Sequence, residues 1–380
     1  MGFTIVEVVL GLTIENTPET ACYIKIIPDT RRKRRMSKMT AEQEKGIFKA
    51  AVVVNDEAGL PNFMTMFYME PGTYKPEDVP EMFKVDGKTV AAVLISQYTN
   101  AMINNIPVSL PYQKPAESMS LDESAAACRR KGPGWHLMTN AEWVYLMKDA
   151  AAAGHTISGN TDYGKNADDP EEKGYCYDGY TVLTGTEPLS WSHDGTPEGV
   201  FGLCGNFWER VAGLRLHKGV IEYIPDNNAA AEDFKPQDPA WTIARTEEPG
   251  EEGLPFGNPL YLDAQCGKVV LTDGQIAGGW NCCHMRDLQL AGSLKEVPEI
   301  IHRLGILPQD WQQEKAGIWV DSELEEAVPL RGSGFYSTSY GGVAALSLCF
   351  ARSLVYYYVS FRSALYLEDW KLVTEILKRA

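Results

Sequence analysis

The segment from Arg331 to Tyr366 contains no aspartate, glutamate or lysine, although the chain of 380 residues carries 51 acidic residues in total. Glutamine, methionine and tryptophan are missing from it too, whereas tyrosine, serine, glycine and phenylalanine are abundant. Tyrosine offers a large amphipathic contact area with few torsions to freeze, and serine and glycine offer adaptable hydrogen bonds, so this composition is typical of a binding surface such as an antibody loop. The alternative is a buried aromatic hairpin. The run Tyr356–Tyr358 argues against that alternative, because consecutive strand side chains alternate between faces.

Basic surface is scarce in this protein, whose formal net charge is −16. Nucleic acid and anionic membranes are therefore disfavoured as partners. The basic run Arg31–Arg35 is interpreted as a solvated loop, with an anion or partner contact as the alternative. No apolar run reaches the roughly 18 residues of a membrane helix, so no membrane insertion is expected. Residues 2–14 resemble the start of a type IV pilin but are predicted to form a β-strand, and no secretion signal is recognisable.

Cysteine and histidine patterns that indicate metal or redox chemistry are lacking. The eight cysteines show no CxxC spacing, and the adjacent Cys282 and Cys283 suit neither a zinc site nor a normal disulfide. Reduced thiols are expected. The six histidines form no HxxxH pair, and neither a glycine-rich phosphate loop nor a nucleophile elbow is present. The sequence therefore predicts no catalytic residues and no metal ligands.

Strand and turn patterns divide the chain at the Asp86-Gly87 turn. Residues 1–88 are predicted to be a mostly β N-terminal unit for attachment or assembly, and residues 89–380 a loop-rich α+β domain that binds a ligand. Ser120 with Glu123, and Thr139 with Glu142, match the capping box that starts a helix. The expected elements are strands at 3–14, 21–27, 50–54, 63–69, 90–97, 208–216, 219–224, 328–336 and 343–361, helices at 121–131, 140–152 and 367–379, and an exposed insertion at 229–257.

Four stretches then occur in order: WHLMTNAEW at 135–143, LTGTEPLSWSHDGTPEGVFGLCGNFWERVAGLRL at 183–216, LRGSG at 330–334 and ARS…VSFRSAL at 351–365. Together they resemble the formylglycine-generating-enzyme type of C-type lectin fold, over roughly residues 90–365. More closely, the chain is similar to the variable proteins of phage and prophage diversity-generating retroelements. In those proteins this fold displays a hypervariable surface near the C-terminus.

The resemblance implies which positions vary. These systems replace template adenines, typically in AAC codons, so a varied position ends in C and can encode Tyr, Ser, Phe, Cys, Leu, Gly, Asn or Asp. Lys, Glu, Gln, Met and Trp are not reachable, and none of them occurs from Arg331 to Tyr366. The implied ligand-binding positions of the variable segment 331–366 are Gly334, Tyr336, Ser337, Tyr340, Ser347, Cys349, Phe350, Leu354, Tyr356, Tyr357, Tyr358 and Ser360. The implied fixed frame of the segment is Arg331, Gly332, Leu346, Leu348, Ala351, Arg352, Phe361 and Arg362.

The resemblance also implies a scaffold. Its tryptophans are expected to fill a core that has few long helices, and its asparagine and glutamate to satisfy neighbouring loops or, as an alternative, to hold a structural calcium. Its arginines have no carboxylate nearby in sequence, so buried ion pairs with distant acids are expected. The scaffold residues are Trp135, Trp143, Asn206, Trp208, Glu209, Arg331, Arg352 and Arg362.

The implied function is non-enzymatic binding of a variable protein or glycan on a bacterial surface, in phage adsorption or host-surface recognition. The implied location is the phage tail tip or the bacterial cell surface, and a homo-oligomer is compatible with it. The main alternative is an oxidase similar to the formylglycine-generating enzyme. That chemistry requires two cysteines five positions apart, and Ala344 stands five positions before Cys349. A calcium-dependent sugar lectin is disfavoured because its EPN or QPD tripeptide is absent.

Overall fold

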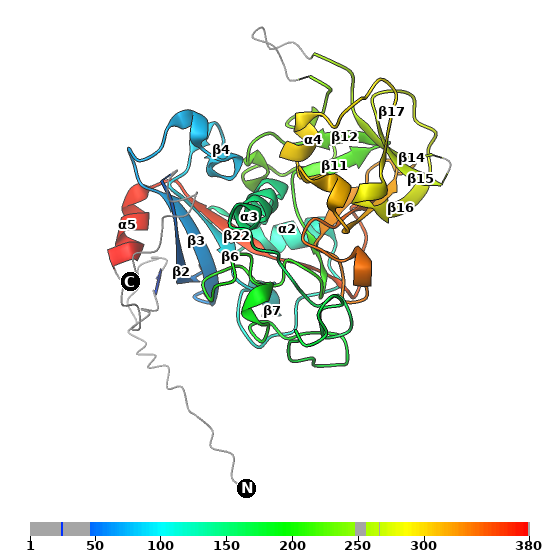
Figure 1. Cartoon of the computed structure of the whole chain (residues 1–380). Coiled ribbons are helices and arrows are strands. Elements are labelled where there is room, and N and C mark those ends of the chain that lie inside the picture. The colour runs from blue at the N-terminus through cyan, green and yellow to red at the C-terminus, as the bar shows by residue number, and fades with distance from the viewer. Residues whose placement is uncertain (1–23, 26–45, 248–255, 266, 379–380) are drawn as a thin grey trace.

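The computed structural model describes residues 24–25, 46–247, 256–265 and 267–378 (Figure 1). The predicted α+β class is confirmed, with short strands predominating over a few short helices. The predicted strand at 3–14 and the basic run at 31–35 lie outside the described residues. No helix among the described residues is long and apolar enough to cross a membrane.

The first sheet, called the N-terminal sheet, has the order β1-β2-β3-β6-β22-β9, and all its neighbouring strands are antiparallel. Its strands combine the start and the end of the described chain. They are β1 (Ile24–Lys25), β2 (Ile47–Asn55), β3 (Pro61–Met69), β6 (Ala92–Ser96), β22 (Ser363–Leu367) and β9 (Trp135–Leu137).

Apolar side chains cover both faces of the N-terminal sheet. On one face, Val373 and Ile376 of α5 (Trp370–Lys378) pack with Leu94. Figure 1 shows this red helix beside the blue strands β2 and β3. On the other face, Trp143 of α3 (Asn140–Ala152) packs in the cluster that contains Phe67.

The predicted division of the chain at residue 88 is corrected for residues 46–88. β3 pairs with β6 from Met64↔Ser96 to Tyr68↔Ala92, so the ladder crosses the predicted boundary. Asp86 and Gly87 do form a turn, but it is the short hairpin between β4 (Lys84–Val85) and β5 (Lys88–Thr89). Residues 46–88 therefore share two hydrophobic clusters with later parts of the described chain.

The second sheet, called the site sheet, has the order β16-β18-β20-β19-β10-β21. Its pairs β18·β20 and β10·β21 are parallel and the others antiparallel. The strands are β16 (Trp280–His284), β18 (Gly317–Asp321), β20 (Leu346–Phe350), β19 (Val328–Arg331), β10 (Trp208–Arg210) and β21 (Val359–Phe361).

A third sheet and several small elements complete the fold. The third sheet has the order β11-β12-β14-β15-β17, with β13 on β12. Its strands are β11 (Leu214–His217), β12 (Val220–Tyr223), β13 (Thr242–Ile243), β14 (Tyr261–Gln265), β15 (Lys268–Thr272) and β17 (Gln289–Ala291). The other elements are the hairpin of β7 (Ala101–Ile103) and β8 (Ile106–Val108), helices α2 (Leu121–Arg129) and α4 (Glu299–Arg303), and the 3-10 turns η1 (Pro76–Asp78), η2 (Glu81–Phe83), η3 (Leu189–Trp191), η4 (Asn228–Ala230), η5 (Met285–Asp287), η6 (Trp311–Gln313) and η7 (Thr338–Tyr340).

The two predicted capping boxes are confirmed. Ser120 accepts a hydrogen bond from the backbone N–H of Glu123 while the Glu123 carboxylate accepts one from the backbone of Ser120, and α2 starts there. Thr139 and Glu142 do the same at the start of α3. Local sequence thus determines both helix starts.

Several predicted strands are shorter than expected, and glycine explains two of the breaks. The strand predicted at 208–216 divides into β10 and β11, in different sheets, and Gly213 between them has φ +89°. The strand predicted at 328–336 ends at Arg331 because Gly332 has φ +84°. The strand predicted at 343–361 is β20, a loop at 351–358 and β21.

The described part of the stretch at 229–257 is only partly exposed, which corrects the expectation of an exposed insertion. Ala229, Ala230, Phe234 and Ala244 are buried, and they pack in three different core clusters. The Glu/Pro/Asp bias of the stretch therefore conceals an apolar set that holds the third sheet to the body.

Candidate functional site

The predicted ligand-binding positions lie at different depths around the site sheet. Tyr336, Tyr356 and Tyr357 are exposed, at 37%, 41% and 48% of their surface. The half-buried positions are Tyr340, Cys349, Phe350, Leu354 and Tyr358. The buried positions are Gly334, Ser337, Ser347 and Ser360. This last group corrects the sequence interpretation, because a buried side chain does not reach a ligand unless its neighbours rearrange.

Tyr336, Tyr356, Tyr357 and Tyr358, here called the tyrosine cluster, form one continuous aromatic surface. The ring centroid of Tyr358 lies 5.1 Å from that of Tyr336, 4.3 Å from that of Tyr356 and 4.9 Å from that of Tyr357. Phe335 packs beneath, with its ring 5.1 Å from the ring of Tyr336. These separations are typical of attractive aromatic pairs. The cluster is therefore an ordered surface and not a set of independent side chains.

Two hydroxyl groups of the tyrosine cluster, those of Tyr336 and Tyr358, have raised pKa values. Burial raises the pKa of Tyr358, and its hydrogen bond with Tyr336 raises it further. Burial also raises the pKa of Tyr336, against hydrogen bonds from Tyr358 and Trp208 that lower it. The indole Nε1 of Trp208 donates to the Tyr336 hydroxyl at 3.3 Å. At neutral pH Tyr336 and Tyr358 thus offer neutral hydroxyls that can donate and accept hydrogen bonds.

Two arginines fix the loop that carries most of the cluster. The Arg352 guanidinium donates to both carboxylate oxygens of Glu326, at 2.8 and 2.9 Å, and to Asp122 at 2.9 Å. Arg210 donates to the backbone carbonyl of Leu354 at 2.5 Å. With its base anchored in this way, the loop presents exposed tyrosines on a rigid support, which limits the entropy lost on binding.

Arg362 forms the buried ion pair that the sequence predicts. Its Nε donates to Glu209 Oε2 at 2.6 Å and its Nη2 to Glu209 Oε1 at 2.5 Å, and both side chains are buried. Further donations go to the carbonyls of Ser96 and Phe201. The pair joins the site sheet to the N-terminal sheet.

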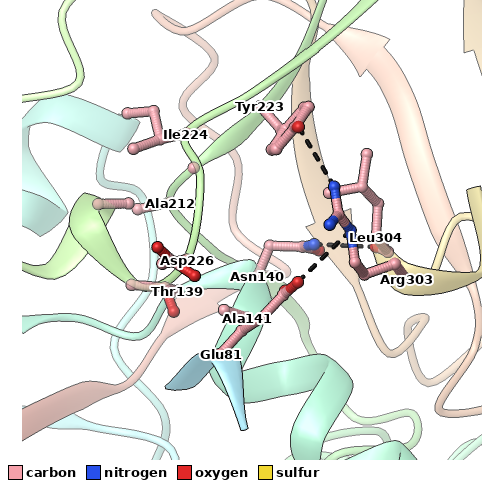
Figure 2. Close-up of a pocket in the computed structure, with 12 residues that line it drawn as sticks. Glu81, Thr139, Asn140, Ala141, Ala212, Tyr223, Ile224, Asp226, Arg303 and Leu304 are labelled. Carbon is pink, nitrogen blue, oxygen red and sulfur yellow. Dashed lines mark hydrogen bonds and ion pairs between the residues drawn. The ribbon is translucent and has the colours of Figure 1, made fainter. Parts of the chain in front are cut away.

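Arg331 corrects the expectation of an ion pair. It is fully buried, and its partners are Asn140 Oδ1 at 2.6 Å and the carbonyls of Gly305 at 2.8 Å and Leu304 at 3.2 Å, not a carboxylate. Burial lowers the pKa of Arg331 to about 9. Figure 2 shows Asn140, which also donates to the Leu304 carbonyl at 2.9 Å. The planar guanidinium suits this set of acceptors, because it donates in several fixed directions at once.

A small polar recess lies beside Asn140 (Figure 2). Arg303 crosses it, with Nε 3.4 Å from the Glu81 carboxylate and Nη2 donating to the Tyr223 hydroxyl at 3.3 Å. The recess encloses about 10 Å³, which is room for roughly one water molecule. It is a packing gap between α4, α3 and the third sheet rather than a ligand site.

The remaining scaffold residues are buried. Trp135, Trp143 and Trp208 are at most 4% exposed. Asn206 accepts hydrogen bonds from Asn160 and from the Val182 backbone and donates to the Val182 carbonyl, each at 3.0 Å. The oxygens considered for calcium, on Asn206 and Glu209, thus already have protein partners, and the described residues contain no group of three or more His, Cys, Asp or Glu side chains that could hold a metal ion.

Aromatic residues outside the variable segment extend the surface, and the sequence interpretation missed them. The Trp319 ring lies 5.2 Å from the Trp208 ring and 5.7 Å from the Tyr340 ring, and His284 stacks on Tyr340 at 4.0 Å. Trp280, on the edge strand β16, is 59% exposed. The spacing of Trp280 and His284 in WNCCH could have revealed this surface in the sequence. Residues two or four apart in a strand lie on the same face.

The loop at 160–180 also adds aromatic surface. Its Tyr163 is 58% exposed, and its ring lies 5.4 Å from the Phe335 ring. The Tyr180 ring lies 4.6 Å from the same Phe335 ring. No sequence pattern could reveal these contacts, because the loop has no periodicity and reaches Phe335 only through the fold.

Cys349 is not part of a thiol pair in the described chain. Its Sγ lies 3.3 Å from the Ser347 Oγ, and burial raises the pKa of its thiol. Ala344 is buried at the position where the oxidase requires the second thiol. Cys282 on β16 is separated from Cys349 on β20 by the strand β18. At roughly 4.8 Å per strand, their Cα atoms are farther apart than the limit of about 7 Å for a disulfide.

Comparison of the sequence with models of known protein families finds no match, and a search among curated proteins finds no relative.

Proposed function

We propose that this protein is a non-enzymatic binding protein of the diversity-generating-retroelement kind, built on a C-type lectin fold. The observation that carries the proposal is the tyrosine cluster: exposed rings in mutual contact, on a loop fixed by arginines, within a segment that lacks acidic residues and lysine. Tyr-rich and Ser-rich surfaces on rigid supports are typical of selected binding sites.

The contacts among the motif residues support the proposed fold. Glu209 of the WER motif is the strand partner of Arg331 of the RGS motif. Its carboxylate forms an ion pair with Arg362. The Trp143 ring lies so close to Gly332 that a Cβ there would be 3.0 Å from it. Residues that the resemblance brought together in sequence thus form one connected frame in space, directly behind the proposed binding surface.

The exposure pattern defines the proposed contact set more narrowly than the sequence does. The contact set comprises Tyr336, Tyr356 and Tyr357, with Tyr340, Cys349, Phe350, Leu354 and Tyr358 at its half-buried margin. Gly334, Ser337, Ser347 and Ser360 shape the surface from below. The ligand proposed is a protein or glycan on a bacterial surface, contacted during phage adsorption or by a host-displayed copy.

The DNA that flanks the gene tests the proposal. A retroelement requires a near-copy of the coding segment for 331–366, differing from it at adenines, beside a gene for a reverse transcriptase. Finding both supports the proposed function. Complete flanking sequence without either element would remove its basis.

The oxidase alternative is tested by metal analysis of protein purified with copper, followed by an assay for oxidation of cysteine-containing peptides. We expect neither stoichiometric copper nor turnover, because Cu(I) chemistry of that kind requires two adjacent thiolates, and the Cys349 thiol has a raised pKa and no partner at Ala344. Copper bound one to one, with turnover, would favour the oxidase.

A further inference from the structure

A second cavity lies behind the loop that carries Tyr336. It encloses about 650 Å³, within the range of roughly 300–1,000 Å³ that is usual for small-molecule sites. Four segments and Cys204 line it: the segments are the end of α3, the loop at 155–168, the residues around η6, and Thr338–Ala344 of the variable segment. None of the tyrosine cluster lines it, so it is distinct from the surface described above.

The buried part of the cavity lining, here called the floor, is mostly apolar apart from Thr161, and the exposed part, called the rim, is acidic. Ile157, Cys204 and Ala344 are buried and line the floor. Asp168, Asp310 and Glu314 contribute carboxylates. The lysine of the lining, Lys315, has its Nζ 3.6 Å from the Asp168 carboxylate. The charged side chains of the rim therefore sum to a net negative charge.

The nearby carboxylates and the C-terminal end of α3 together give the cavity a negative potential. Burial, together with the carboxylates of Glu314, Asp168 and Glu172, raises the pKa of the Cys204 thiol on the floor to about 12. In addition, Ala150, Ala151 and Gly154 of the lining belong to or follow the last turn of α3, and the C-terminal end of a helix carries partial negative charge. Anionic ligands are disfavoured in such a site, and the apolar floor disfavours a fully hydrated inorganic ion.

We propose that this cavity binds a small organic cation, with an ammonium or guanidinium group at the acidic rim and a short hydrocarbon body on the apolar floor. A free amine and a basic side chain of a macromolecular ligand share this chemistry. The proposal does not depend on the proposed function of the tyrosine cluster.

Saturation-transfer NMR on the full chain tests the proposal with n-butylguanidinium, and with the neutral isostere n-butylurea as the control ligand. We expect saturable binding of the guanidinium and little or none of the urea. The variant Asp310→Asn/Glu314→Gln should weaken the guanidinium at least about fivefold, since adjacent opposite charges lose their attraction. Ala151→Trp, on the exposed last turn of α3, should block it by filling the cavity.

Matched variants keep the test specific. Glu375→Gln removes an exposed carboxylate on α5 and should leave binding unchanged, as should Tyr356→Ser/Tyr357→Ser, which separates this proposal from the proposed function. The capped peptide Gly-Gly-Arg-Gly-Gly distinguishes the two sources: binding equal to that of n-butylguanidinium indicates a basic side chain, and no binding indicates a free amine. Equal binding of guanidinium and urea, no binding of either, or binding that survives both cavity variants would overturn the proposal.

Discussion

Arg362 and Glu209, 153 residues apart in sequence, meet as a bidentate ion pair with both side chains buried. The pair lies between the N-terminal sheet and the site sheet, because Arg362 separates β21 from β22 while Glu209 belongs to β10. The pair therefore connects the frame of the proposed binding surface to the N-terminal sheet.

Replacing Arg362 by Met is expected to lower the free energy of unfolding by about 3–5 kcal/mol, because Glu209 would remain buried without its partner. Urea denaturation measures the change. Arg130→Met is the matched control, since Arg130 is exposed and surface substitutions usually stay within about 0.5 kcal/mol. Equal effects of the two substitutions would show that the buried pair does not stabilise the frame.

The tyrosines of the cluster are expected to divide into two classes. Tyr356→Ser/Tyr357→Ser removes exposed rings and should change the unfolding free energy by about 1 kcal/mol or less in total. Tyr358→Ser should cost more, because Tyr358 packs on the core and contacts the other rings of the cluster. Thermal melts of the two variants give the comparison. A double variant that unfolds while the Tyr358 variant melts normally would reverse the assignment of surface and core.

Glu187 is expected to make stability fall as the pH rises. Burial raises its pKa from 4.5 to about 7, against backbone hydrogen bonds and Arg362, which lower it. Between these values the folded protein binds more protons than the unfolded chain, so the contribution of Glu187 is complete below about pH 4.5 and is lost as the pH passes about 7. Glu187→Gln should abolish this part of the pH dependence. The melting temperatures of the wild type and the variant are measured from pH 4 to pH 8. Their difference should change in sign or size in that window. Parallel curves of melting temperature against pH would contradict the assignment to Glu187.

A fragment of residues 89–380 is expected not to fold. It lacks β2 and β3, whose removal uncovers β6 and deprives both clusters around the N-terminal sheet of Val52, Met64 and Phe67. Circular dichroism and solubility of the fragment, compared with a chain that begins at residue 46, measure this. A soluble fragment with a cooperative melt would restore the domain boundary that the sequence predicted at residue 88.

Local signals in the sequence were sufficient for the starts of α2 and α3 but not for the strand ends. The capping boxes at Ser120 and Thr139 predict α2 and α3 because both partners of each box lie within four residues. The break of the strand predicted at 343–361 has no such signal: the loop at 351–358 is held by Glu326 and Arg210, which are distant in sequence. For the same reason the contacts of Arg331 with the carbonyls of Leu304 and Gly305 could not be predicted.

The sequence predicted the composition of the candidate site but not which of its residues are buried. The absence of acidic residues and lysine from 331–366 located the tyrosine cluster, and codon chemistry suggested which residue types vary. Burial of Ser347 and Ser360 depends on strand pairing with β18 and β10, which a single sequence does not reveal. The contributions of Trp319 and Tyr163 likewise arise from tertiary contacts.

Sequencing many copies of the coding segment for 331–366, from a population that carries the gene, tests the central claim most directly. The account predicts amino-acid differences at the exposed and half-buried positions, above all Tyr336, Tyr356 and Tyr357, drawn from the residues that adenine substitution can encode. It predicts none at the frame residues Arg331, Arg352 and Arg362, whose buried or anchored contacts hold the loop. A uniform segment, or differences that fall on the three arginines as often as on the tyrosines, would contradict it.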